Sequence, residues 1–423
     1  MKRVFPLFFS FLLLIGVLIP QFGFSAEVVK IGTINPMTGV LALAGQETLR
    51  GIEIAAAMQN KRGGVQGKQI VLVKGDSQTL KTAVTEAERL ISVEGIKLFA
   101  GEYSSSRAKA ATAVSEKYGC IYLVDVALAD DITSRGFKYV FQAMGRAYLW
   151  GSDGAKFIAE EAAPKLGRKP NELRVALAHE DSDFGTSISA AFVQKAMEYH
   201  MKIVATEPYS ASAVDLSSLI LRLKQANPDI LILTPYIRDG ILFLSQARDA
   251  GLSPKVILCP GGVLSNQVFN DKLGDDMNYV LVTSSASLDV KKEAFKPEAW
   301  AALQEFIEQY KKEHKQDPPQ DAYHGFNGAW LFFHFVLPRS KSLDPDDVEK
   351  TLRNLTLEPG ESVTTFGYKF APLGHSNPGT NLIGYPNIFQ WQKGSINHCV
   401  YPKKFASSEL MLPMPAWGQR SMK

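Results

Sequence analysis

The feature that most constrains the fold of this chain is a long alternation of short apolar segments with amphipathic segments of about ten residues or more. The short segments are typical of buried strands, and the longer ones have the periodicity of helices. Such an alternation predicts βαβ units and a parallel sheet covered by helices on both faces. In its first part the predicted strands are residues 28–34, 70–73, 97–100 and 121–124, and the predicted helices are residues 47–60, 82–91 and 107–118.

The alternation pauses around residues 141–146 and then begins again. A second sheet of similar size is therefore predicted, so the fold class is α/β with two doubly wound lobes, and residues 141–146 form the first crossing between them. The predicted strands of this second part are residues 174–178, 203–207, 230–233 and 256–258, and its helices are residues 150–166, 186–199, 216–226 and 241–250.

After residues 279–283, which we interpret as the return crossing, the pattern becomes helical. The predicted helices at 298–313, 322–336 and 345–354 are expected to pack on the first lobe, and the aromatic, Gly-rich stretch 366–400 is typical of β hairpins. The predicted organisation is an N-terminal lobe of residues 26–143 plus 284–365, a C-terminal lobe of residues 144–283 plus 366–400, and a tail of residues 401–423, in loop or strapped to the surface.

Residues 1–25 are predicted to be a secretory signal peptide. Lys2 and Arg3 give the positive start, residues 7–19 give the apolar run, and small residues follow it. Cleavage after Ser25 places Gly23 at the −3 position and is preferred over cleavage after Ala26, and an uncleaved membrane anchor is the less favoured alternative. We therefore expect a periplasmic protein.

Charge, cysteines and missing motifs exclude several classes of protein. The formal charge is +3, without a basic stripe, so a nucleic-acid partner is not expected. Three widely spaced cysteines form no disulfide framework, although one disulfide stays open, and they lack the paired spacing of a metal site. The phosphate loop, the Gly-x-Ser-x-Gly elbow and the dinucleotide fingerprint Gly-x-Gly-x-x-Gly are absent, so no enzyme, metal or cofactor is expected.

Three loops follow predicted strands, at the sheet edge where open α/β folds bind ligands. In residues 101–106 the serines are expected to cap the next helix, whose free N–H groups favour a carboxylate. In residues 179–185 the acids match no Ca²⁺ loop, so Asp183 and Gly185 are expected to shape the turn while Phe184 faces a ligand. In residues 234–236 Tyr236 offers both a ring and a hydroxyl. His324 and His334 are interpreted as packed or surface residues rather than ligands.

The run Ile31-Gly-Thr-Ile-Asn-Pro-Met-Thr-Gly39, the Gly63-Gly64 turn, the serines at 104–106 and the late Phe389-Gln-Trp391 resemble the periplasmic binding proteins of ABC importers, of the branched-chain amino-acid (Leu/Ile/Val) type. The resemblance runs through nearly the whole chain in order. It implies two Rossmann-like lobes joined by a three-strand hinge, a membrane permease and an ATPase as partners, and a monomer that closes over a small ligand. The ligand-binding residues implied are Tyr103, Ser104, Ser105, Ala127, Ala129, Phe184, Tyr236 and Gly261.

Two positions depart from that family's pattern. The acid that holds the ligand's ammonium in amino-acid binders is here Gly261, and a pocket aromatic is replaced by Ala44. Burying an ammonium without a carboxylate partner is unfavourable by roughly several kcal/mol. Either Glu102, Asp125 or another acid takes over, or the ligand has no ammonium. The sequence favours the second: a carboxylate or amide with an apolar or aromatic body, in a pocket enlarged by Ala44 and Gly261.

The leading functional hypothesis is therefore the extracytoplasmic solute-binding component of an importer. The alternative is a soluble amide or amino-acid sensor of the same fold. A nicotinamide-dependent enzyme would fit the sheet topology but lacks the glycine fingerprint.

Overall fold

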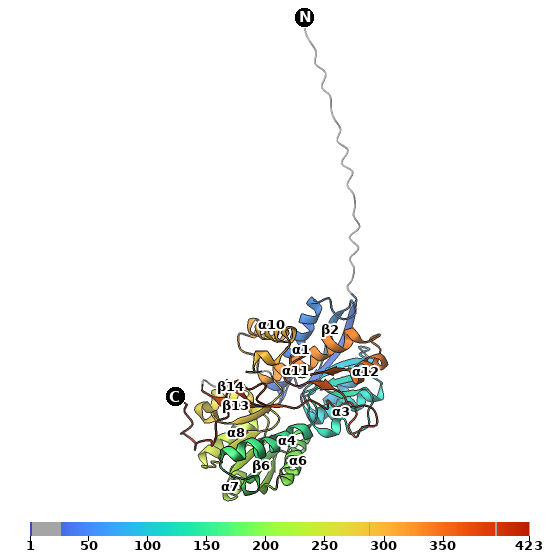
Figure 1. Ribbon diagram of the computed structural model, residues 1–423. Helices are drawn as coiled ribbons and strands as arrows, with labels where there is room; N and C mark the ends of the chain where they lie inside the picture. The colour runs from blue at the N-terminus through green and yellow to red at the C-terminus, as the bar shows by residue number, and fades with distance from the viewer. Residues whose placement is uncertain (2–26, 287, 394–395, 423) are drawn as a thin grey trace.

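A computed structural model describes residue 1 and residues 27–286, 288–393 and 396–422 of the chain. The predicted signal peptide at 1–25 lies, apart from Met1, outside these residues. The described chain forms two lobes, each built on one large sheet (Figure 1). The predicted α/β class is confirmed.

The first lobe contains a parallel sheet with the strand order β2-β1-β3-β4-β5. Helices α2 and α3 pack together on one face, where alanines such as Ala83 and Ala108 meet Phe99 and Tyr122 of the sheet. Helix α1 covers the other face. The strands are β1 (Val28–Asn35), β2 (Gln69–Asp76), β3 (Leu98–Gly101), β4 (Ile121–Val124) and β5 (Val140–Gln142), and the helices are α1 (Ala42–Lys61), α2 (Leu80–Ser92) and α3 (Ser105–Lys117).

The second lobe contains a seven-stranded sheet with the order β14-β13-β10-β9-β8-β6-β7, parallel except at β13 and β14. Helices α4 and α6 cover one face, and they approach closely because Gly151 has no side chain: a Cβ there would lie 2.5 Å from the Ile188 carbonyl oxygen. Its strands are β6 (Arg174–Glu180), β7 (Lys202–Tyr209), β8 (Ile230–Thr234), β9 (Val256–Cys259), β10 (Leu281–Ser284), β13 (Asn387–Gln392) and β14 (Ile396–Tyr401), and its helices are α4 (Ala147–Phe157), α5 (Ala163–Lys165), α6 (Asp183–Glu198), α7 (Ser217–Gln225), α8 (Ile237–Asp249) and α9 (Gln267–Leu273).

The helices after β10 return to the first lobe, as predicted. Helix α11 (Gln320–Trp330) packs along α1, and α10 (Pro297–His314) lies beside them (Figure 1). The contact needs glycine on both helices, because a Cβ on Gly51 would lie 2.0 Å from the Ala322 oxygen and one on Gly325 would lie 2.0 Å from the Thr48 oxygen. A π-helical turn at Leu331–Val336 interrupts the helix predicted at 322–336, and α12 (Pro345–Asn354) follows.

Three segments cross between the lobes and lie side by side. The first follows β5, the second follows β10, and the third precedes β13. Ser285 Oγ lies 2.9 Å from Met144 Sδ, and a Cβ on Gly384 would lie 2.7 Å from the Met144 carbonyl oxygen. The return crossing lies after residue 284 rather than at the predicted residues 279–283, because residues 281–284 pair with β9 and β13 inside the second sheet.

The stretch 366–386 contacts the first lobe. Within it β12 (Tyr368–Lys369) pairs with β11 (Thr356–Leu357), Thr380 bridges to Gln142 of β5, and Phe370 packs edge-on against Phe141. We therefore propose that the last segment of the C-terminal lobe begins near residue 387 rather than at 366, with the other lobe boundaries unchanged.

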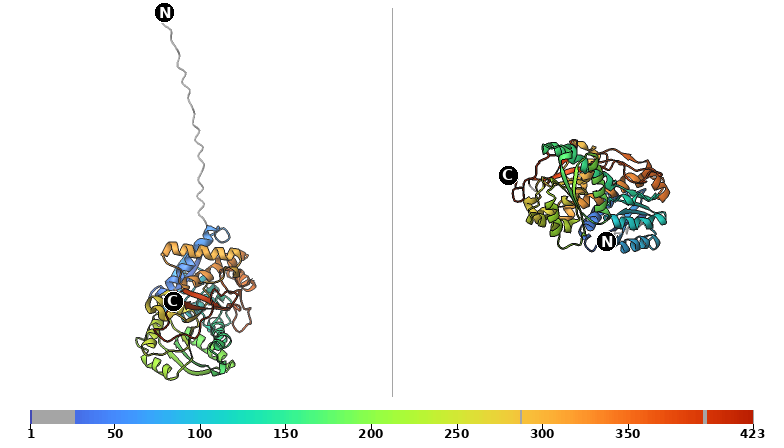
Figure 2. Two further views of the ribbon diagram at one scale, coloured as in Figure 1. Left: turned by 60° about the vertical axis from the view of Figure 1, so that its left-hand side comes forward. Right: turned by 90° about the horizontal axis from the view of Figure 1, so that it is seen from below.

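The tail after β14 is strapped along the second lobe. The Met414 N–H donates to the Lys255 oxygen, the Trp417 indole donates to the Leu252 oxygen at 2.6 Å, and Arg420 donates to the Asp276 oxygen. Figure 2 shows the C-terminus on this lobe, away from the end where the chain enters the first strand. Among the described residues, none of the helices combines the length and the apolar content needed to cross a bilayer.

Candidate functional site

A small cavity lies between the lobes, next to the ends of β3, β4, β8 and β9. Its volume is about 20 Å³, which is room for on the order of one water molecule. The first lobe supplies Tyr103, Val126, Ala127, Leu128, Asp321 and His324, the second supplies Phe184, Tyr236, Gly261 and Val263, and Met144 comes from the first crossing. Five of the eight predicted site residues therefore meet in one place: Tyr103, Ala127, Phe184, Tyr236 and Gly261.

The serines at the start of α3 act differently from the expectation. Ser104 is the N-cap residue, but its hydroxyl does not cap the helix, and its N–H donates to Glu102 Oε1 at 3.1 Å. The Ser105 hydroxyl instead accepts the N–H groups of Leu128 and Ala129, at 3.2 and 3.1 Å. Ser105 and Ala129 thus fix the wall behind the cavity, while Ser104 lines a neighbouring hollow. The prediction that a serine caps α3 is wrong.

Aromatic rings from both lobes meet beside the cavity. Phe184 stacks on Tyr236 with the ring centroids 5.5 Å apart, and Tyr103 of the first lobe lies 6.2 Å from Tyr236. The Tyr236 hydroxyl is 3.3 Å from the Ser182 hydroxyl. Burial raises the pKa of Tyr236, and hydrogen bonds to Ser182 and Ser104 act in the opposite direction. Since Tyr103 belongs to the first lobe, its ring contact with Tyr236 links the lobes at the cavity.

Gly261 does not enlarge the pocket as the sequence led us to expect. Its φ is +97°, and a Cβ there would lie 2.6 Å from Phe184 Cζ and 3.0 Å from Ile188 Cδ1. The space gained by the missing side chain is therefore occupied by the Phe184 ring. Ala44, by contrast, lines an open hollow of about 200 Å³ beside Tyr103.

The turn at 179–185 is organised by Glu180 rather than by Asp183. The Glu180 carboxylate accepts the Ser182 N–H at 2.8 Å, the Ser182 hydroxyl at 2.7 Å and the Gly185 N–H at 2.7 Å. Asp183 instead lies 3.8 Å from Lys109 of α3, which makes an ion pair across the lobes. Within the described part of the chain, acids, histidines and cysteines form no group of three that could hold a metal ion.

Several carboxyl groups lie buried around the cleft. Burial raises the pKa of Glu102 and of Asp239 to about 7, and it raises the pKa of Asp125 well above its usual range. Both Asp125 oxygens and Glu102 Oε2 are buried without a hydrogen-bond partner in the described part of the chain. Of the described acids around the cleft, however, only Asp321 lines the central cavity.

Sequence reasoning missed Asp321. His324 is buried, which is one of the two alternatives interpreted from the sequence, and it also lines the cavity. Both stand on one face of α11, because they are three residues apart, and both line the cavity. The rule that ligands bind at strand ends does not point to a helix that returns from a later part of the chain. The i, i+3 spacing of an acid and a histidine just after Pro319 was the signal available in the sequence.

Two larger hollows adjoin the central cavity. One, of about 390 Å³, opens at the cleft mouth between Ser104, Arg107, Ser182 and Tyr236. The other is the 200 Å³ hollow beside Ala44 and Tyr103. Because Tyr236 and Tyr103 form the partitions, movement of either ring would join a hollow to the cavity.

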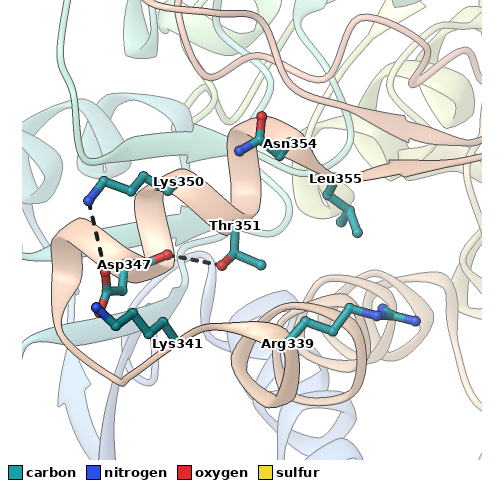
Figure 3. Close-up of a pocket in the computed structure, with 7 residues that line it drawn as sticks. All are labelled: Arg339, Lys341, Asp347, Lys350, Thr351, Asn354 and Leu355. Atoms are coloured by element: carbon teal, nitrogen blue, oxygen red, sulfur yellow. Dashed lines mark hydrogen bonds and ion pairs between the residues drawn. The ribbon is translucent and has the colours of Figure 1, made fainter.

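A separate hollow of about 490 Å³ lies over α12 (Figure 3). Every residue that lines it comes from positions 339–355 of the first lobe, and the close-up shows Lys350 paired with Asp347 rather than directed at an open centre. Separation of the lobes does not change this hollow, so it is not part of the interlobe site.

Comparisons with known proteins agree with this architecture. The family model for periplasmic binding proteins matches residues 28–401. The Leu/Ile/Val-binding protein homolog 7 of Brucella abortus is 36% identical over 386 residues, which are 91% of this chain and 94% of the relative.

Two solved structures share the fold at lower identity. A branched-chain amino-acid transporter substrate-binding protein from Streptococcus pneumoniae, in complex with isoleucine, has a TM-score of 0.71 and 19% identity, covering 92% of this chain and 100% of its own. A solute-binding protein from R. palustris, in complex with benzoate, has a TM-score of 0.70 and 18% identity, covering 92% of this chain and 97% of its own.

Proposed function

The chain belongs to the family of periplasmic binding proteins, and we propose that it captures a small carboxylate- or amide-bearing molecule between its lobes in the periplasm and delivers it to the permease and ATPase of an ABC importer. The observation that carries this proposal is a cavity whose wall is shared by both lobes at their strand ends. Such a cavity forms only when the lobes are together. A ligand that contacts both walls therefore favours the closed state.

The described state is closed, and polar contacts across the lobes hold it. Ser265 of the second lobe hydrogen-bonds Gln320 of α11, and Ser284 donates to the same Gln320 oxygen at 3.0 Å. Lys109 reaches Asp183. Because the remaining cavity holds on the order of one water, we infer that the lobes separate and that Tyr103 or Tyr236 moves when a ligand enters.

For the ligand's orientation we propose that its carboxylate or amide faces Ser104 and the start of α3. The side chain of the N-cap residue, Ser104, makes no capping hydrogen bond, and the helix dipole favours an anion or a carbonyl oxygen there. The apolar or aromatic body of the ligand would then lie against Phe184 and Tyr236, with Ala127 and Gly261 completing the wall. We further propose that the protein acts as a monomer and without catalysis.

The ligands named for the similar proteins suggest a range for the ligand of this chain. One structural neighbour holds isoleucine and another holds benzoate, so the same fold serves a ligand with an ammonium and one without. The Brucella relative is named for leucine, isoleucine and valine. We propose that the ligand of this chain lies within the range of amino acids, apolar or aromatic acids and their amides.

The test is native mass spectrometry of the purified mature protein, followed by calorimetric titration with a panel of those compounds. Ser104→Ala should weaken binding of the best compound about tenfold, the effect of one lost hydrogen bond to a charged group. Ser115→Ala is the matched control, because this buried serine lies on the same helix and donates to the Thr112 oxygen instead. Absence of any bound or titratable compound, or equal affinities for the two variants, would contradict the proposal.

A further inference from the structure

Helix α11 brings two polar side chains to a cavity wall that is otherwise aromatic and aliphatic. Asp321 is 4% exposed and His324 is 1% exposed, and they stand one above the other on the helix face turned to Tyr103, Phe184 and Tyr236. Among the residues that the structure describes, no lysine or arginine lines this cavity, and Asp321 is the only carboxylate in its wall. The wall therefore presents a negative or acceptor group without a cationic partner.

Among the described residues these two side chains have fewer partners than buried polar groups normally have. Neither ring nitrogen of His324 has a hydrogen-bond partner among the described residues. Asp321 Oδ2 accepts one long hydrogen bond, 3.5 Å from Asn266 Nδ2 across the lobe boundary. Leaving such groups unsatisfied is unfavourable by about 1–3 kcal/mol each. A molecule in the cavity is the natural source of the missing hydrogen bonds.

The neighbours of Asp321 leave it free for such a role. Glu47 of α1 is bound by Arg50 and by the Tyr310 hydroxyl, so it is not available to the cavity. Burial keeps His324 neutral by lowering its pKa to about 3, and burial raises the pKa of Tyr103. Burial also raises the pKa of Asp321 to about 7, with Glu47 acting in the same direction. An ionised Asp321 thus requires a strong donor, and the one side-chain donor to it among the described residues is Asn266 at 3.5 Å.

We propose that Asp321 is the residue that selects the ligand, by accepting a hydrogen bond from a nitrogen that carries hydrogens, either an ammonium or an amide. This rests on the proposed function and makes it more specific. His324 gives the second contact, because a neutral imidazole offers one donor and one acceptor. A carboxylate without any N–H group would place a negative charge or a bare oxygen against Asp321 and is rejected. Asp321 of the first lobe thus supplies the acid that is absent at position 261 of the second lobe, where a glycine stands.

The test uses two sets of compounds, in each of which an amino acid and an amide are compared with the acid of the same carbon skeleton. Leucine differs from 4-methylpentanoate only by its ammonium, and 4-methylpentanamide differs from it only by its amide nitrogen. Phenylalanine, 3-phenylpropanamide and 3-phenylpropanoate form the second set. We expect the wild-type protein to bind an amine or amide member at least about tenfold more tightly than the matching acid, which corresponds to about 1.4 kcal/mol. Asp321→Asn keeps an acceptor oxygen, so it should weaken the amino acid more than the amide. Asp321→Leu removes the acceptor and should abolish the preference for both. Asp125→Asn is the control, since Asp125 is an equally buried acid of the same lobe outside the cavity wall.

The pH dependence separates the two sources of the N–H group. If the ligand is an ammonium, its affinity should rise between about pH 6 and 8 as Asp321 ionises, and the rise should vanish in Asp321→Asn. A neutral amide should show little change. An acid that binds more tightly as pH falls, or a preference that survives in both Asp321 variants with circular dichroism showing them folded, would overturn this inference while leaving solute capture intact. Failure of every compound to bind would instead contradict the proposed ligand range itself.

Discussion

Gly261→Ala tests the arrangement of the site most directly, because two separate penalties can be assigned to it. The first is conformational: a side chain at φ +97° is unfavourable by about 1–2 kcal/mol. The second is steric, since the new Cβ would lie 2.6 Å from Phe184 Cζ and 2.9 Å from Phe184 Cε2. Overpacking of a closed core destabilises by about 1–3 kcal/mol. We therefore expect a total loss of about 2–5 kcal/mol in the free energy of unfolding, which we would measure by urea denaturation.

The matched control is Gly167→Ala in the same lobe. Gly167 also has a positive φ, +66°, but a Cβ there would meet no atom within 4 Å. Its loss should consist of the conformational penalty alone, so the two variants should differ by about 1–3 kcal/mol. The Phe184 ring must also move when Cβ is present at 261, and the cavity has only about 20 Å³ to receive it. Calorimetric titration should therefore show weaker ligand binding in Gly261→Ala and unchanged binding in Gly167→Ala.

Equal destabilisation of the two variants would refute the reasoning. It would mean that Phe184 does not occupy the space beside Gly261, and hence that the pocket is wider than the stacked rings allow. Tighter binding of a bulky aromatic acid by Gly261→Ala would have the same consequence.

Three further predictions follow from buried groups elsewhere. The native state retains a proton on Glu102 up to its folded pKa of about 7, whereas the unfolded chain releases it near 4.5. The free energy of unfolding should therefore fall as pH rises between these values. Glu102→Gln should lessen this fall by on the order of 3 kcal/mol, measured by urea denaturation at pH 5 and 8. Burial raises the pKa of Cys120 to about 11 and those of Cys259 and Cys399 to about 12, and all three thiols are free and buried. Iodoacetamide at pH 8 should therefore leave the native protein unlabelled and add three groups after denaturation. Rapid labelling of the native protein would contradict the burial of these thiols. Gly325→Ala would place a Cβ 2.0 Å from the Thr48 oxygen and should separate α11 from α1, lowering both stability and ligand affinity, and an unchanged melting temperature would show that the helices do not touch there.

The sequence was sufficient for those elements whose signal is local. The strand at 121–124 and the helix at 345–354 were placed at their observed ends, because each is a short run with a strong apolar pattern or a Pro at its start. Helix α9 was not predicted, since its seven residues carry too little periodicity to stand out. The π-helical turn after Trp330 was missed for a related reason, because nothing in an apolar run shows an added residue per turn.

Site residues were predictable where they follow a strand in the chain and not where a returning helix supplies them. Tyr103 and Tyr236 stand at strand ends, and the rule for open sheets was enough to single them out. Asp321 reaches the cavity only because Gly51 and Gly325 let α11 lie against α1, a tertiary contact without a local signal. The role of Gly261 was also not predictable from local sequence. A missing side chain suggests open space, but the Phe184 ring, from another segment of the chain, occupies that space.

The unequal contribution of the two lobes bears on how specificity arises. The second lobe offers mainly rings, and rings accept many apolar bodies with similar affinity. Asp321 and His324 of the first lobe act differently, because both are buried in the closed state, where Asp321 accepts one long hydrogen bond and neither His324 nitrogen has a partner among the described residues. A ligand that fits the rings but leaves these atoms unpaired incurs their desolvation penalty on closing, so it gains little from the closed state. Discrimination at this site would then come from rejecting ligands that lack the matching polar group. The fraction of closed protein, the state that presents both lobes to a transporter, would therefore depend on the ligand's polar group more than on its apolar body.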